Sequence, residues 1–343
     1  MPVVEMGASK LILDGYGSYL SMEKGQYVVK DKRGNITKYP MFENPIDEVV
    51  MKSGNTITTG ALTSLGWWEV DILFLTRKGR PVCYLKSIDD DGHVETRLKQ
   101  YEAYNNDKGF YIAKQVVLSR IEGQNTLLRK YGLSLPDINV EMLIDNVDSG
   151  NYRQKLIGVE GKFTENYFRQ VLKLFPEKLR PESRKKFQAY DGVNNVLNLA
   201  YEILGWKIHR ALIKAKLEPF LGFLHSLQHG KPSLVCDFKE LYRYLIDDFV
   251  IQYCQDLNKR DFIMKSETIA RKRTGKREYL NEPKTRDMMK KLYDYLESMV
   301  DIPRIKIGKR QSIETLINEE CQLLAKYIRG EKDTWEPRVI EYI

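Results

Sequence analysis

The residues best suited to chemistry lie between positions 217 and 243. Asp237 and Glu240 are three apart, so on a helix they project from the same side. His225 lies upstream in an otherwise apolar run, and Gly230 and Pro232 then allow the chain to turn back. Two carboxylates and an imidazole can bind a divalent cation such as magnesium or manganese. Such a cation would serve phosphodiester chemistry, because the transition state gathers negative charge on the non-bridging oxygens.

Each of these residues also has a purely structural interpretation. Two acids at the start of a helix often only complement its dipole, and a lone histidine in an apolar run is usually a satisfied core residue. Glu160 does not stand out, because its surroundings read as a helix start with Phe163, Tyr167 and Phe168 packed. The spacing alone therefore leaves the metal site and the structural interpretation both open.

Basic side chains form the second chemical feature. Lys and Arg number 55 against 47 Asp and Glu, which gives a net charge of +8. A basic cluster can contact DNA phosphates by displacing condensed counterions, although most charge runs are simply solvated surface. Three clusters are candidates for such a surface: Arg180, Arg184, Lys185 and Lys186; Arg271, Lys272, Arg273, Lys276 and Arg277; Lys306, Lys309 and Arg310.

The elements that must position these residues change in kind along the chain. Residues 11–87 alternate short apolar runs with tight turns, which predicts strands, including a hairpin at Lys24-Gly25. After His93 the apolar spacing becomes helical. The sequence therefore predicts an α+β protein, with an N-terminal β-domain over 1–91 and an all-α catalytic domain over 92–343.

Two helices of the second domain can be placed from their periodicity. The first follows Asp191, a suitable N-cap, and must end before Pro219. The second covers 235–257, with Asp237 and Glu240 off its apolar stripe. The stretch 265–290 is rich in basic and polar residues and is expected to be a mobile basic loop.

The remaining composition indicates a cytoplasmic protein. None of the four cysteines, Cys83, Cys236, Cys254 and Cys321, forms a CxxC pair, so we expect free thiols in a reducing compartment. No apolar run approaches the ~18 residues that a bilayer crossing needs, and we expect no membrane partner.

Several segments together resemble a known family, the CRISPR-associated endonuclease of spacer acquisition, the first-numbered protein of that series. The resemblance covers nearly the whole chain. It is carried by the segments ITTGALTSLGWWEVDILFLTRKGRPV (57–82), HVETRLKQY (93–101), GVEGKFTENYF (158–168), DGVNNVLNLAYEIL (191–204), LEPFLGFLH (217–225) and CDFKELYR (236–243). The chain departs from the family pattern at Lys216, where the family usually has Gly, and at Glu218, where it usually has Asp.

The resemblance implies a catalytic set of Glu160, His225, Asp237 and Glu240. Of these, Glu160, His225 and Glu240 would be the ligands of Mg²⁺ or Mn²⁺, and Asp237 would support the site. The corresponding DNA contacts are expected at Arg184, Lys185, Lys186, Arg243, Arg271 and Arg273.

The implied activity is a metal-dependent transesterification. The 3′-hydroxyl of a prespacer DNA would attack a phosphodiester at the edge of a CRISPR repeat, and hydrolysis of DNA would be the version with water as nucleophile. The expected assembly is a homodimer joined largely through the β-domains, and two such dimers would flank a dimer of a small ferredoxin-like CRISPR-associated partner. A related integrase of a mobile element and a non-enzymatic DNA-binding scaffold are the alternatives.

Overall fold

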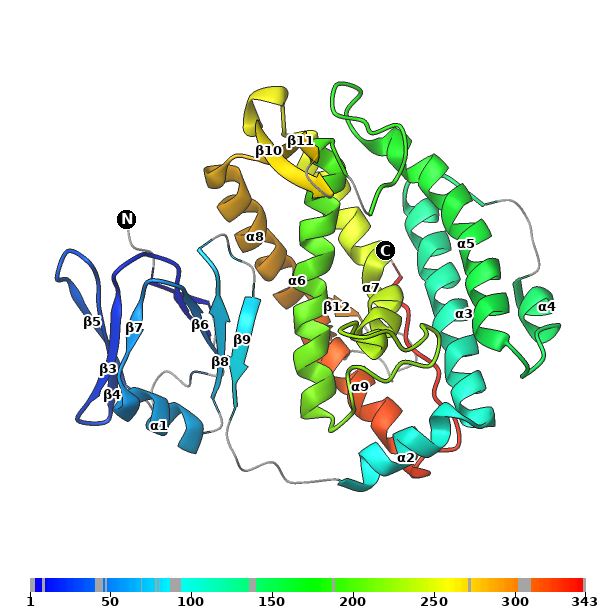
Figure 1. Cartoon of the computed structure of the whole chain (residues 1–343), viewed down its shortest axis with the longest axis horizontal. Coiled ribbons are helices and arrows are strands. Elements are labelled where there is room, and N and C mark those ends of the chain that lie inside the picture. Colours follow the sequence, from blue (N-terminus) through cyan, green and yellow to red (C-terminus); the bar gives the residue numbers. More distant parts are fainter. Residues whose placement is uncertain are drawn as a thin grey trace. The chain divides into compact units, whose positions relative to one another are not determined.

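The computed structural model divides the chain into two compact units, Met1–Gly92 and His93–Ile343, here called the N-terminal unit and the helical unit. Each unit has its own hydrophobic core. The model describes residues 4–7, 10–40, 46, 48–68, 70–77, 79, 81–86, 94–135, 140–186, 189–270, 273–301 and 310–341. These strands and helices, drawn in Figure 1, confirm the α+β class.

The larger sheet of the N-terminal unit has five strands in the order β1-β2-β6-β8-β9. The inner strands β2, β6 and β8 are parallel, and β1 and β9 pair antiparallel at the edges. Leu11, Val49 and Ile72, one from each inner strand, are fully buried. The strand bounds are β1 (Val4–Gly7), β2 (Lys10–Leu13), β6 (Glu48–Lys52), β8 (Asp71–Leu75) and β9 (Pro81–Leu85).

The smaller sheet has the order β5-β4-β3-β7. Its β3–β4 hairpin turns at Lys24 and Gly25, whose φ angles of 46° and 76° are the left-handed values that a two-residue turn requires. This confirms the predicted hairpin. The elements are β3 (Tyr19–Glu23), β4 (Gln26–Lys30), β5 (Ile36–Pro40), β7 (Thr56–Ile57) and the helix α1 (Thr59–Trp67).

The helical unit is built around α7, which packs against both α3 and α6. Nearly every position of α7 is buried, on all its sides. The helices are α2 (Val94–Tyr104), α3 (Asp107–Lys130), α4 (Val140–Asp145), α5 (Tyr152–Val171), α6 (Gly192–Lys214), α7 (Ser233–Gln255), α8 (Glu282–Glu297) and α9 (Ile313–Arg329), with short 3₁₀ turns at η1 (Leu172–Leu174) and η2 (Lys259–Asp261). None of the described helices combines the length and apolarity that a bilayer crossing requires.

The predicted limits of the helices are partly confirmed. Asp191 caps α6 by accepting a hydrogen bond from the Asn194 amide, and α6 ends at Lys214, before Pro219. Glu160, however, lies in the middle of α5, which begins at Tyr152, so its placement at a helix start was wrong.

The expectation of an all-α second domain is also wrong. The stretch expected to be a mobile loop instead forms a long antiparallel hairpin of β10 (Phe262–Ala270) and β11 (Arg273–Leu280), followed by α8, although residues 271–272 lie outside the described part. A second pair, β12 (Met299–Asp301) and β13 (Arg310–Ser312), precedes α9. The longer hairpin is held at its base, where Phe262 and Leu280 are buried and the Gly192 amide donates to the Glu278 carboxylate.

Candidate active site

Two of the predicted metal ligands meet at one arginine. Glu160 on α5 and Glu240 on α7 both contact the guanidinium of Arg120 on α3. The Arg120 Nε lies 2.7 Å from Glu160 Oε1, and the Arg120 Nη1 contacts Glu240 Oε2. Arg120 is 5% exposed and Glu240 6%, so this contact is largely removed from water. Three helices thus bring two acids to a single buried cation.

Thr164 fixes the Arg120 guanidinium from the side of α5. Its hydroxyl accepts hydrogen bonds from Arg120 Nε and Nη2, at 3.2 and 2.9 Å, and from Gln124 Nε2 at 3.0 Å. It donates one to Glu160 Oε1 at 2.7 Å. Burial lowers the pKa of Arg120 to about 10, and the neighbouring Glu160 opposes this fall. The guanidinium stays charged at neutral pH because a pKa of about 10 still lies well above 7.

The α7 face continues from Glu240 to a second arginine and a second acid. Arg243 Nη1 donates to both Glu240 oxygens, at 3.0 and 3.1 Å, and its guanidinium lies 4.4 Å from the ring centre of Tyr201. Asp247, one turn further, accepts from the hydroxyls of Tyr167, at 2.7 Å, and Tyr201. Burial raises the pKa of Asp247, although the two phenols oppose the rise.

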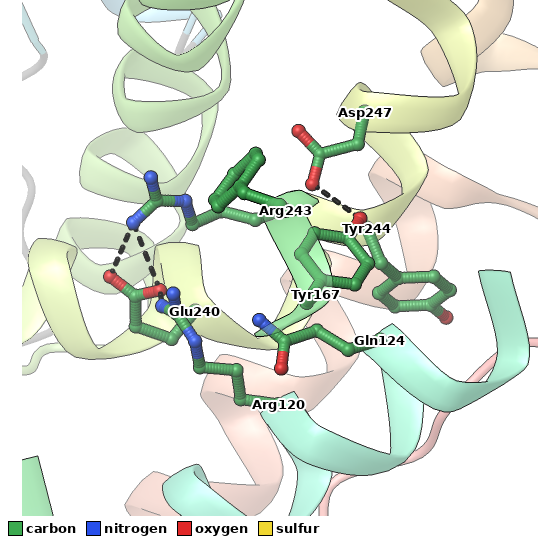
Figure 2. A pocket seen from close by; sticks show the side chains of 8 residues that line it. Arg120, Gln124, Tyr167, Glu240, Arg243, Tyr244 and Asp247 are labelled. Carbon is green, nitrogen blue, oxygen red and sulfur yellow. Dashed lines mark hydrogen bonds and ion pairs between the residues drawn. The ribbon is translucent and has the colours of Figure 1, made fainter. Parts of the chain in front are cut away.

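Figure 2 shows Arg120, Glu240, Arg243, Tyr167 and Asp247 around one pocket. Arg120 and Arg243 approach Glu240 from two sides, while Asp247 turns toward Tyr167. The pocket is lined by Arg120, Gln124, Tyr167, Phe168, Glu240, Arg243, Tyr244 and Asp247. It therefore joins the acid–arginine contacts to the buried Asp247.

The other two predicted site residues form a separate arrangement. Asp237 is fully buried and accepts the amides of Phe223, at 2.6 Å, and Leu224, at 3.0 Å, through Oδ2. Its Oδ1 accepts the His225 amide at 2.9 Å and lies 2.7 Å from His225 Nδ1. Gly222 permits this packing, because a Cβ there would come within 2.8 Å of Asp237 Oδ2. Asp237 therefore shapes the loop before α7 and orients His225.

The predicted acids and histidine thus fall into two pairs. Glu160 and Glu240 share Arg120, whereas His225 and Asp237 bind each other. Across the described part of the chain, no three His, Cys, Asp or Glu side chains gather as a metal-ligand set. The placement of Asp237 and Glu240 away from the buried face was wrong, since α7 is buried on all sides and the two residues are 0% and 6% exposed.

The predicted DNA contacts differ in their exposure and in the contacts described for them. Arg184 is committed to the fold, since it donates to the side-chain oxygens of Asn194 and Asn198. Lys185 and Lys186 are exposed. Arg243 is held by Glu240, with 20% of its side chain exposed. Arg271 lies outside the described residues, and Arg273 is described only as part of the β11 backbone.

Arg120, Thr164 and Asp247 were not predicted from residue spacing in the sequence. A signal for Arg120 was present, because it falls among Val116, Val117 and Ile121 on the face of α3 that turns out to be buried. A cation on an apolar face needs a buried counter-charge. Thr164 stands one turn after Glu160, on the same side of the helix.

Solved structures share this fold over almost the whole chain. A casposase bound to an integration product superposes with a TM-score of 0.78 at 21% identity, covering 98% of this chain and 94% of that one. A CAS1 protein from Thermotoga maritima gives a TM-score of 0.74 at 19% identity, covering 98% of this chain and 100% of the other. A Cas6-RT-Cas1–Cas2 complex gives 0.69 at 20% identity, over 99% of this chain and 37% of that chain. The fold is that of the Cas1 and casposase structures.

The chain belongs to the family of CRISPR associated protein Cas1, whose family model matches residues 11–284. A CRISPR-associated endonuclease Cas1 from Thermodesulfovibrio yellowstonii is 30% identical over 305 residues, covering 84% of this chain and 88% of the relative. Another, from Archaeoglobus fulgidus, is 29% identical over 267 residues, covering 71% of this chain and 76% of the relative. The family suggested by the sequence motifs is confirmed.

Proposed function

We propose that this protein is a metal-dependent DNA endonuclease and integrase that inserts prespacer DNA into a CRISPR array by transesterification. The observation that carries the proposal is the convergence of Glu160 and Glu240, from two different helices, on one buried cation-binding position. Carboxylate oxygens are the ligands that Mg²⁺ and Mn²⁺ prefer, and the pair already balances the charge of a cation. The residues therefore fit a divalent metal, provided that Arg120 yields its place.

His225 would complete the ligand set through its Nε2 atom. An ionised Asp237 carboxylate can only accept, so the hydrogen between it and His225 belongs to Nδ1. The tautomer with the proton on Nδ1 leaves the Nε2 lone pair for a metal, and a carboxylate behind a histidine ligand orients it and raises its basicity. We therefore place Asp237 behind His225 as a positioning residue.

The bound cation would neutralise phosphate charge and activate the attacking hydroxyl or water. The chain's own groups would hold the DNA around it. Arg243, fixed beside Glu240 and partly exposed, would contact a non-bridging phosphate oxygen. Lys185 and Lys186 lie on the exposed segment that Arg184 ties to α6, and they would bind phosphates further along the strand.

The proposed partners are DNA and other proteins of spacer acquisition. A homodimer joined largely through residues 1–91 and a small ferredoxin-like partner completing a heterohexamer would bring two such sites to the two strands of a repeat. This proposal is supported by similar solved chains, one a casposase bound to an integration product and one from a Cas6-RT-Cas1–Cas2 complex.

The test is strand transfer on a CRISPR repeat with Mg²⁺ or Mn²⁺ and a labelled prespacer, comparing wild type with Glu160→Ala, His225→Ala and Glu240→Gln. Each variant should lose at least 100-fold in rate, because each removes a metal ligand. Glu165→Gln, on the same helix but exposed, is the matched control and should keep full activity. Full activity in Glu160→Ala would refute the ligand assignment.

Two further measurements separate the alternatives. A titration that shows no binding of millimolar Mn²⁺ would favour a DNA-binding scaffold over an enzyme. Transfer into DNA without any preference for a repeat would favour an integrase of a mobile element.

A further inference from the structure

The cation that joins Glu160 and Glu240 belongs to the chain itself. All three nitrogens of the Arg120 guanidinium have partners at this point: Nε meets Glu160 and Thr164, Nη2 meets Thr164, and Nη1 meets Glu240. Two carboxylates in one buried place would repel each other without a cation between them. Arg120 therefore supplies the charge that lets α5 and α7 bring these acids together.

A divalent ion held by both carboxylates would lie in the place between them that Arg120 now fills. Glu160 Oε1 already accepts from Thr164 and Arg120, and Glu240 Oε2 contacts Arg120 and Arg243. A metal held by both carboxylates would compete directly with the guanidinium for them. Under such competition the apparent affinity for the metal is the intrinsic affinity multiplied by the fraction of molecules in which Arg120 has left the site.

We propose that Arg120 is a built-in competitor of the metal: its guanidinium occupies the Glu160–Glu240 position in the metal-free chain and is displaced when a divalent ion binds. The inference rests on the metal site proposed above. Arg120 thereby sets how much Mg²⁺ or Mn²⁺ the site requires, and it keeps the two acids neutralised whenever the metal is absent.

The decisive variant is Arg120→Ala, studied in the full-length chain by counting free Mn²⁺ with electron paramagnetic resonance. Loss of the competitor should tighten Mn²⁺ binding about tenfold or more. The metal-free variant should unfold at a lower temperature than wild type, and saturating Mn²⁺ should raise its unfolding temperature by more than it raises that of wild type.

Guanidinium ions added to the solution can show whether Arg120 weakens Mn²⁺ binding by filling the position between the two acids or only by repelling the metal with its charge. Guanidinium chloride at about 20–50 mM is roughly a hundred times too dilute to denature the protein. In Arg120→Ala, the guanidinium ion should bind where the Arg120 side chain was. It should then compete with Mn²⁺ for the two carboxylates and raise the unfolding temperature. Sodium chloride at the same ionic strength should do neither. In wild type both salts should act alike, because the position is already filled.

Lys207→Gln is the matched control. Lys207 and Glu314 form another buried ion pair in this unit, 3.1 Å apart and with side chains 7% and 18% exposed, close to the 5% and 16% of Arg120 and Glu160. This variant should lose stability without any change in Mn²⁺ affinity. Arg120→Lys, which keeps the charge but cannot reach both acids, provides a second test and should also bind Mn²⁺ more tightly than wild type.

The outcomes separate this inference from the function on which it rests. Unchanged or weaker Mn²⁺ binding in Arg120→Ala and Arg120→Lys, or no effect of guanidinium, would overturn the competitor role and leave the enzyme intact. Absence of Mn²⁺ binding in wild type and in both variants would instead remove the metal site itself.

Discussion

Asp237→Asn tests whether the Asp237 carboxylate holds the loop before α7 and orients His225. The buried carboxylate accepts two hydrogen bonds on each oxygen, from the amides of Phe223 and Leu224 on one and from the amide and ring of His225 on the other. An asparagine presents one oxygen and one NH₂, so in either orientation at least one backbone N–H donor faces a donor, and the remaining hydrogen bonds lose the assistance of the negative charge. With about 1.5–3 kcal/mol for each charge-assisted bond lost, the variant should be destabilised by about 3–6 kcal/mol.

The loss can be measured as a shift in thermal unfolding and compared with a control on the same helix. For a unit of this size a loss of 3–6 kcal/mol lowers the unfolding temperature by roughly 10 °C. Asp248→Asn also removes a buried carboxylate with three donors, Lys130 Nζ, the Tyr131 hydroxyl and Gln252 Nε2, which lie outside the pocket. Both variants should lose stability, but only Asp237→Asn should also lose strand transfer, at a temperature where both remain folded.

Two outcomes would contradict these roles of Asp237. A change of less than 1 kcal/mol in Asp237→Asn would show that the four hydrogen bonds do not hold the loop. Stability lost with strand transfer retained would show that the orientation of His225 by Asp237 has no part in catalysis. A ¹⁵N spectrum of the His225 ring gives an independent reading, since wild type should carry its proton on Nδ1.

Three further variants test the surroundings of the site. Gly222→Ala should abolish strand transfer and lower stability by about 3 kcal/mol or more, measured by urea unfolding, because its Cβ would meet Ser233 backbone atoms at 2.6 and 2.8 Å. Lys216→Gly should stabilise the chain by about 1 kcal/mol in the same assay, because Lys216 holds a φ of 62° that glycine adopts without cost; unchanged stability would refute this. Burial lowers the pKa of His209 below 6.5, although Glu218 opposes the fall. The stability from neutral His209 is therefore present above pH 6.5 and lost as pH falls through the lower folded pKa. His209→Phe should reduce the change in unfolding free energy between pH 7.5 and 5.5, and an undiminished change would assign that dependence elsewhere.

The fold was predictable wherever a helix or strand has a cap or turn of its own and a continuous apolar face. Asp191 and the positive-φ turn at Lys24-Gly25 mark their elements locally, so the sequence suffices there. The β10–β11 hairpin could not be predicted in this way. Its anchoring residues, Phe262 and Leu280, lie at the two ends of a polar stretch, and its attachment to Gly192 is distant in the sequence.

The candidate site was predictable only in part, and for a related reason. Family motifs pointed to Glu160 and Glu240, but which groups surround an acid depends on helices that meet only in the folded chain. Arg120 is one arginine among many basic residues, and only its position on an apolar helix face marked it as different. The pairing of His225 with Asp237, rather than of Asp237 with Glu240, follows from the loop before α7 and not from helical spacing.

The three site acids of α7 differ in the groups that hold them, and this difference is the reason we propose Glu240, of the three, as a metal ligand. Asp237 is surrounded by neutral N–H donors that belong to a loop, and it cannot release them without unfolding that loop. Asp247 accepts hydrogen bonds from two phenols, which oppose the rise in its pKa that burial causes, and these described donors are neutral side chains. Glu240 alone of these three is held by side-chain cations, from Arg120 and Arg243. A divalent ion in the place of Arg120 would leave Glu240 beside a positive partner, and the contacts described for Asp237 and Asp247 offer no comparable exchange.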